Sequence, residues 1–170
     1  MIRRTLAATL GAWLGACICL AAGCGEPPDL ILGSGITDQL DATDLDEMML
    51  GFEYGISVAE IELMLAISKN GARIVSHPAR RYVLYTLLLQ PDERGSLVVS
   101  SDDFDAIVVV AARDGTVVGA GNDRPDPTGM ETDAELVLDN PLNQNMTVWV
   151  VVTDFGTPTG GAFSVAVTPE

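Results

Sequence analysis

The sequence predicts an all-β protein, an antiparallel β-sandwich of the jelly-roll type, and three observations carry this prediction. From about residue 82 onward, short segments rich in β-branched and aromatic residues alternate with turn-forming residues. Asp114 and Gly115 join two of these segments, and an Asp-Gly pair is typical of tight hairpins because both residues tolerate positive φ. The continuous apolar run over residues 148–152 fits a central strand with little solvent exposure.

Seven segments are expected to form the strands, and seven short strands are typical of a sandwich. They comprise residues 82–89, 97–101, 106–111, 116–120, 134–138, 146–153 and 162–168. Residues 156–161 contain three glycines and a proline, which predicts a turn before the last strand. Strand alternation should point Phe104 and Phe163 inward, between the two sheets.

Residues 57–69 allow two structures. Apolar residues alternate from Ile61 to Ile67 as in a strand, whereas Ser57 and Glu60 have the spacing of a capping box that opens a helix. The alternation favours a strand, and a short helix over 57–69 is the alternative. A helix here would be apolar on nearly every face, which favours docking onto a partner, whereas a strand with one polar face favours a self-contained module.

The first 24 residues have the layout of a secretory signal. Arg3 and Arg4 precede a long apolar run, which ends in small residues directly before Cys24. This stretch resembles a bacterial lipoprotein signal, and the resemblance implies cleavage before Cys24 and an acyl anchor, such as palmitate, on that cysteine. Cys17 is a second candidate for the anchor, and a retained transmembrane helix over residues 5–22 is the other interpretation.

The domain organisation follows from the signal. Residues 1–23 would be the signal peptide, residues 24–35 the lipid anchor and a flexible tether, and residues 36–170 a single sandwich domain. In a Gram-negative source, the residue after the anchor, Gly25, implies an outer-membrane or surface location, since an aspartate there commonly retains such proteins in the inner membrane. The sequence thus predicts an exported, membrane-anchored protein.

The mature part would be strongly acidic. It contains seven basic and 24 acidic residues, a net charge of −17, with Lys69 as its single lysine. Nucleic acid is therefore excluded as a partner, because a phosphate-binding surface needs concentrated Lys and Arg. The mature chain has no cysteine beyond Cys24 and hence no internal disulfide. An acidic surface suits divalent cations or basic partners.

Two acidic groups are expected to meet at one end of the sandwich, since one precedes the strand over 106–111 and the other follows the hairpin partner of that strand. Together they comprise Asp102, Asp103, Asp105, Asn122, Asp123 and Asp126. Calcium binds six to eight such oxygen ligands, so these loops are a candidate calcium site. The alternative is that they are solvated turn residues. A third group, from Asp38 to Asp46, is expected to form an exposed loop or a helix cap.

No catalytic constellation is evident. His77 is the only histidine, which excludes a zinc site built on imidazoles, and no nucleophile elbow surrounds Ser76, Ser100 or Ser101. The protein is therefore expected not to be an enzyme. Tyr82, Tyr85 and Trp149 lie in valine-rich and leucine-rich segments and are expected in the core, with an aromatic platform for a carbohydrate or peptide as the alternative.

The order of these elements resembles the bacterial pre-peptidase C-terminal domain over about residues 82–168. The resemblance rests on residues 100–105 leading into a strand, then Asp114-Gly115, then residues 121–123, and finally the strand over 148–153 with its glycine turn. Residues 143–147 depart from the Gly-Thr-Tyr type of segment that the family has before its penultimate strand. The resemblance implies a non-catalytic module linked with secretion, adhesion or, in some members, calcium binding.

Together these observations predict a lipid-anchored, non-enzymatic binding or adhesion module of the bacterial cell envelope, stabilised by calcium in its acidic loops. Its partner would be a protein or a carbohydrate. The alternative is a metal-free scaffold that docks a protein through residues 47–67.

Overall fold

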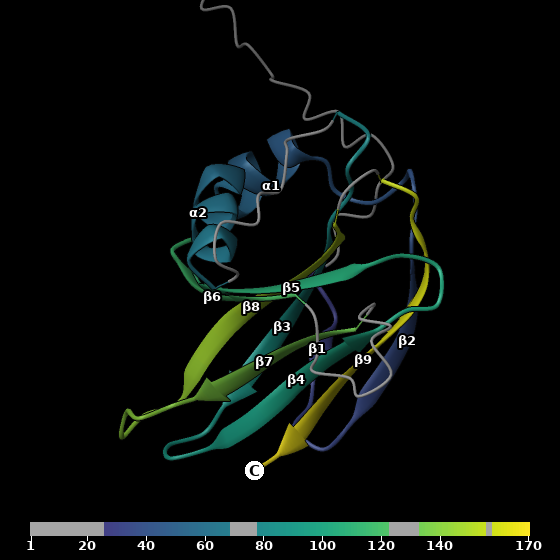
Figure 1. Cartoon of the computed structure of the whole chain (residues 1–170). Coiled ribbons are helices and arrows are strands. Elements are labelled where there is room, and N and C mark those ends of the chain that lie inside the picture. The colour runs from purple at the N-terminus through teal and green to yellow at the C-terminus, as the bar shows by residue number, and fades with distance from the viewer. Residues whose placement is uncertain (1–25, 69–77, 123–132, 156–157) are drawn as a thin grey trace, which may run out of the picture.

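The structure is a computed structural model and describes residues 26–68, 78–122, 133–155 and 158–170. Two β-sheets pack face to face, and two helices cover the outer face of one of them (Figure 1). The predicted antiparallel sandwich is confirmed. Its core therefore has two layers, one between the sheets and one beneath the helices.

The larger sheet has five strands. In spatial order they are β1 (Asp29–Leu30), β3 (Val83–Leu89), β8 (Met146–Asp154), β5 (Ala106–Ala112) and β6 (Val117–Gly121). Every neighbouring pair is antiparallel except β1 with β3. The valine-rich strand β8 lies at the centre, as its continuous apolar run predicts.

The smaller sheet has four strands and is antiparallel throughout. In spatial order they are β2 (Gly35–Leu40), β9 (Gly161–Pro169), β4 (Arg94–Ser100) and β7 (Ala134–Asp139). All seven strands expected from the sequence are present, with ends that differ by a few residues. The structure adds β1 and β2, which the sequence did not indicate.

The Asp-Gly hairpin forms as predicted between β5 and β6. Gly115 has a φ of 91°, a left-handed conformation that glycine adopts without strain. The Thr116 amide donates to Oδ1 of Asp114 at 3.0 Å, and the Ala112 amide donates to the Thr116 carbonyl at 2.8 Å. The side chain of Asp114 therefore fixes the turn that aligns the two strands.

The layer between the sheets contains the two phenylalanines that the alternation placed there. Phe104 and Phe163 are both buried and meet edge to face, with ring centroids 6.0 Å apart. Tyr85 is fully buried in the same layer, and its hydroxyl donates to Oδ2 of Asp38 at 2.7 Å. The expectation of a core role for these aromatic residues is confirmed.

The second layer lies between the helices and the five-stranded sheet. It is formed by α1 (Glu47–Tyr54), α2 (Val58–Ser68) and the outer faces of the strands beneath them. Tyr82 and Trp149 are buried here, at 1% and 8% exposure. They are therefore core residues, and the alternative of an exposed aromatic platform is wrong.

The strand favoured over residues 61–67 is not formed, because this segment is helix α2. Val58, Ile61 and Leu65 recur at helical spacing and are buried against the sheet. Leu63 and Ile67 are exposed, but they are also apolar. Together with Ile61 and Leu65 they give the sequence an apolar residue at every second position, which is the pattern of a strand. The alternative, a short helix over 57–69, is the one that the structure adopts.

The predicted tether is also too long. Residues 29–35 include β1, and Leu30 is 2% exposed within the core between the sheets. In the described part of the chain, both core clusters consist of residues between Leu30 and Val167. Neither helix in the described part of the chain is long and apolar enough to span a bilayer.

Candidate functional site

The two helices are fixed by local signals in the sequence. Asp46 is the N-cap of α1, and its Oδ1 accepts the Met49 amide at 2.8 Å. Gly55 ends the helix with a φ of 72°, and its amide donates to the Gly51 carbonyl at 3.1 Å. The expectation of a helix cap in the acidic group from Asp38 to Asp46 is thus confirmed for Asp46, whereas Asp38 lies in β2.

Contacts with Trp149 hold α1 onto the sheet. Tyr54, in the last turn of α1, meets the Trp149 ring edge to face, with centroids 5.2 Å apart and planes at 79°. The guanidinium of Arg113 lies over the Trp149 ring, 3.7 Å from its centroid. Leu50 is fully buried beneath the same helix. The inner side of α1 is thus firmly packed, and its outer side keeps a fixed orientation.

The outer sides of both helices carry large apolar residues. Met48 and Phe52 on α1 are 76% and 91% exposed, and Leu63 and Ile67 on α2 are 60% and 68% exposed. Each pair has the spacing i and i+4, so its two side chains share one side of their helix. We call these four residues the helical face.

The charged residues of the two helices are all acidic. Glu47 and Glu53 on α1 and Glu60 on α2 are exposed, and no lysine or arginine occurs from residue 47 to residue 68. An exposed apolar group with a rim of one charge is characteristic of an interaction surface. This arrangement can bind a partner that offers an apolar groove with basic residues at its edge.

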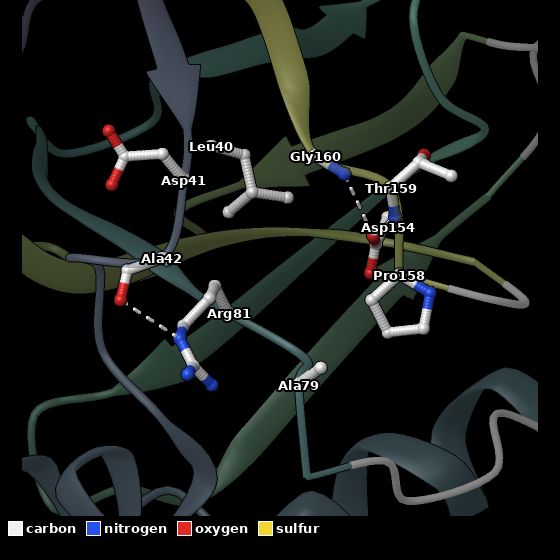
Figure 2. Close-up of a pocket in the computed structure, with 9 residues that line it drawn as sticks. All are labelled: Leu40, Asp41, Ala42, Ala79, Arg81, Asp154, Pro158, Thr159 and Gly160. Atoms are coloured by element: carbon white, nitrogen blue, oxygen red, sulfur yellow. Dashed lines mark hydrogen bonds between the residues drawn. The ribbon is translucent and has the colours of Figure 1, made fainter.

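A small pocket of about 160 Å³ lies where the loop after β2 meets the segment before β9 (Figure 2). Its cation, Arg81, donates to the carbonyls of Ala42 at 3.3 Å, Pro78 at 3.2 Å and Arg80 at 2.9 Å. These bonds fix the neighbouring loops together. The guanidinium therefore acts as a structural clamp.

The carboxylate of this pocket, Asp154, is also used by the fold. It is 1% exposed, and its Oδ1 lies 3.6 Å from Nε of Arg80, which is equally buried. Its Oδ2 accepts the amides of Thr159 at 2.9 Å and Gly160 at 3.5 Å (Figure 2). Asp154 thus holds the segment before β9 in place. The charged side chains of this pocket are bonded to the protein itself, so the pocket has a structural role.

The predicted calcium residues are only partly brought together. Asp102 and Asp103 line a polar hollow of about 450 Å³, which Asp133 also lines. The Ala162 amide donates to Oδ2 of Asp103 at 2.8 Å, and Ser100 donates to Oδ2 of Asp133 at 2.9 Å. Asp133 was not indicated by the sequence, although it stands directly before β7.

The other predicted ligands lie beside this hollow or outside the described residues. The pairing of Val108 with Gly121 places Asp105 and Asn122 at the same end of the β5–β6 hairpin, and neither residue lines the hollow. Asp123 and Asp126 fall outside the described residues. In the part of the chain that is described, no group of three or more His, Cys, Asp or Glu side chains is placed to hold a metal ion.

Comparisons with known proteins find little. No protein-family model matches the sequence, and no curated protein matches it. Among solved structures, the pre-peptidase C-terminal domain of collagenase from Bacillus anthracis aligns with 84% of this chain and 94% of its own, at 9% identity and a TM-score of 0.46.

Proposed function

We propose that this chain is an exported, lipid-anchored, non-enzymatic sandwich of the bacterial cell envelope, which docks a protein partner through the helical face. One observation carries the proposal: Met48, Phe52, Leu63 and Ile67 are exposed on two helices whose inner sides are firmly packed. Residues 58–68 also form a helix and not a strand, and of these two structures the helix is the one that favours docking over a self-contained module.

The energetics support docking. Burying an exposed Leu, Ile, Met or Phe side chain stabilises a complex by about 1.5–3 kcal/mol. Phe52, at 91% exposure, has nearly its whole ring available for this. The rigid backbone of a packed helix lowers the entropy lost on binding, and the acidic rim selects a partner with Lys or Arg around an apolar groove.

The leader sequence supports the location. Acylation of Cys24 would fix the N-terminus to a membrane, and residues 25–28 would then connect it to β1. That link is short, so the domain would stay close to the bilayer, where its partner is expected. The outer membrane is the destination that Gly25 implies in a Gram-negative source. Calcium stays a prediction from the sequence, since two of its six residues lie outside the described ones.

Site-specific photo-crosslinking in the native host tests the docking surface. The photoreactive residue p-benzoylphenylalanine would replace Phe52 or Leu63, and, as a matched control, Leu88, an exposed leucine on β3 at 48%. We expect one discrete adduct of the same mass from both helical positions and none from Leu88. Equal labelling from all three positions, or no adduct from either helix, would contradict the proposal.

A further inference from the structure

A second apolar feature lies between the sheets, at the edge of the sandwich. Strand β6 ends the five-stranded sheet and β7 ends the four-stranded sheet, and each is paired on one side only. A cavity of about 280 Å³ opens between these two edge strands. It is separated from the helical face, because the helices cover the opposite face of the five-stranded sheet (Figure 1).

Glycines on β6 shape this cavity. A Cβ atom at Gly121 would clash with the carbonyl oxygen of Glu135, so the two strands lie very close at that end. At Gly119 a Cβ would lie 3.2 Å from Cδ2 of Leu136, and the space that it would fill belongs to the cavity. Gly121 and Glu135 do not line the cavity, whereas Val118 does. The space is therefore a wedge, closed toward Gly121 and open toward Val118.

The walls of the wedge are aliphatic. The residues that form them include Leu89, Val110, Leu136, Leu138, Met146 and Val148. Of these, Leu136 and Met146 are only partly buried, and they pack against the inter-sheet core. Methionine adapts its shape easily, so Met146 can adjust to an occupant without disturbing the buried valines.

Among the residues that the structure describes, a single ionisable side chain lines the wedge. It is the exposed Asp139, the last residue of β7. Arg94 lies opposite Asp139 in the pairing of β4 with β7, and its guanidinium forms an ion pair with Glu170 at 2.8 Å. The Asp139 carboxylate therefore repels an anionic group and attracts a cationic one, and the strongly acidic chain adds to this preference. Sites of this kind, with apolar walls and few polar groups, are typical of small-molecule binding.

From this geometry we infer that the wedge binds a single-chain amphiphile, with its alkyl chain between β6 and β7. The head group, zwitterionic or cationic, lies beside Asp139. An unbranched chain fits a space that narrows toward Gly121, and a fatty acid is disfavoured because its carboxylate would face Asp139.

The test uses the chain from Gly25 onward, which keeps every residue of the two core clusters. With methyl-labelled methionine, the probe is dodecylphosphocholine below its micelle concentration, compared with dodecanoate and with phosphocholine alone. We expect a saturable shift of the Met146 methyl signal and none of Met48, which lies on the helical face. Dodecanoate should bind at least about tenfold more weakly, and phosphocholine should not shift Met146.

Matched variants identify the site. Val118→Trp would fill the open end, since Val118 is 54% exposed and lines the wedge, and it should weaken binding at least about tenfold. Ile31→Trp adds the same ring next to β1, at the opposite edge of the five-stranded sheet, and should leave binding unchanged. Asp139→Asn should reduce the preference over dodecanoate, whereas Glu53→Gln on α1 should not. A Met48 shift in place of a Met146 shift, binding that survives Val118→Trp, or equal affinity for dodecanoate would each overturn the inference.

Discussion

At the residue scale, the buried pair of Arg80 and Asp154 is the most consequential contact. Both side chains are 1% exposed, and Asp154 also accepts two backbone amides of the segment before β9. Removing one partner of such a pair is costly, because the other charge stays in a medium that solvates it poorly. The pair therefore links the start of β3 to the start of β9 at one end of the sandwich.

We expect Asp154→Ala and Asp154→Asn each to lower the free energy of unfolding by about 3–5 kcal/mol, since both remove the charge facing Arg80. Arg94→Ala is the control, because it breaks an exposed ion pair with Glu170 and should cost less than about 1 kcal/mol. Urea unfolding followed by circular dichroism measures all three. A small effect of Asp154→Asn beside a large effect of Asp154→Ala would show that the amide bonds matter and the charge does not.

Two buried tyrosines make stability depend on alkaline pH. Burial raises the pKa of Tyr82, and burial followed by the hydrogen bond to Asp38 raises the pKa of Tyr85. Their contribution to stability is complete below the ordinary tyrosine pKa of about 10, and it falls as pH rises above it, because the unfolded chain then loses protons that the folded chain keeps. Absorbance at 295 nm should show both phenols ionising only with unfolding. Titration of either phenol near pH 10 in the folded protein would contradict this.

The calcium prediction also belongs to single residues. If Asp105 and Asp123 bind calcium, a concentration about 100 times Kd should raise Tm by roughly 5–10 °C over EDTA, because the ion binds the folded state alone. Asp105→Ala or Asp123→Ala should abolish the rise, and Glu53→Ala on α1 should preserve it. No difference between calcium and EDTA would make these aspartates ordinary turn residues.

At the scale of the elements, two glycines should respond in opposite directions to alanine. Gly51 lies inside α1 with nothing closer than 3.8 Å to an added Cβ, so Gly51→Ala should stabilise the protein by up to about 1 kcal/mol. Gly121 faces the backbone of β7, so Gly121→Ala should cost about 1–3 kcal/mol by pushing the edge strands apart. Thermal unfolding of both variants measures these changes in stability. An unchanged stability of Gly121→Ala would contradict the prediction and show that β6 and β7 can move apart easily.

The elements also show what the sequence could reveal. The strands after residue 82 were predictable, because β-branched runs and the Asp114 turn signal their structure locally. Helix α2 was indicated only as the alternative to a strand, because Leu63 and Ile67 add apolar residues outside the buried stripe of Ile61 and Leu65. Strand β1 is only two residues long and is defined by its pairing with β3, which no local pattern encodes.

At the scale of the molecule, the helical layer distinguishes this sandwich from one with both outer faces polar. It covers one sheet, holds Trp149 beneath it and presents the helical face outward. The sequence indicated residues 47–67 as a possible docking region. It did not indicate which of their apolar side chains are exposed, because that depends on the secondary structure of the segment. The anchor on Cys24 would restrict that surface to the vicinity of the membrane.

The mass of the complex extracted from the native envelope tests the central claim most directly. We predict that the wild-type chain elutes with a partner, well above its monomer mass, and that Phe52→Ser combined with Leu63→Ser returns it to the monomer. Both residues are largely exposed, so the double variant should still fold, and Leu88→Ser should retain the complex. A monomeric wild type, or a complex of unchanged mass in the double variant, would contradict docking through the helical face.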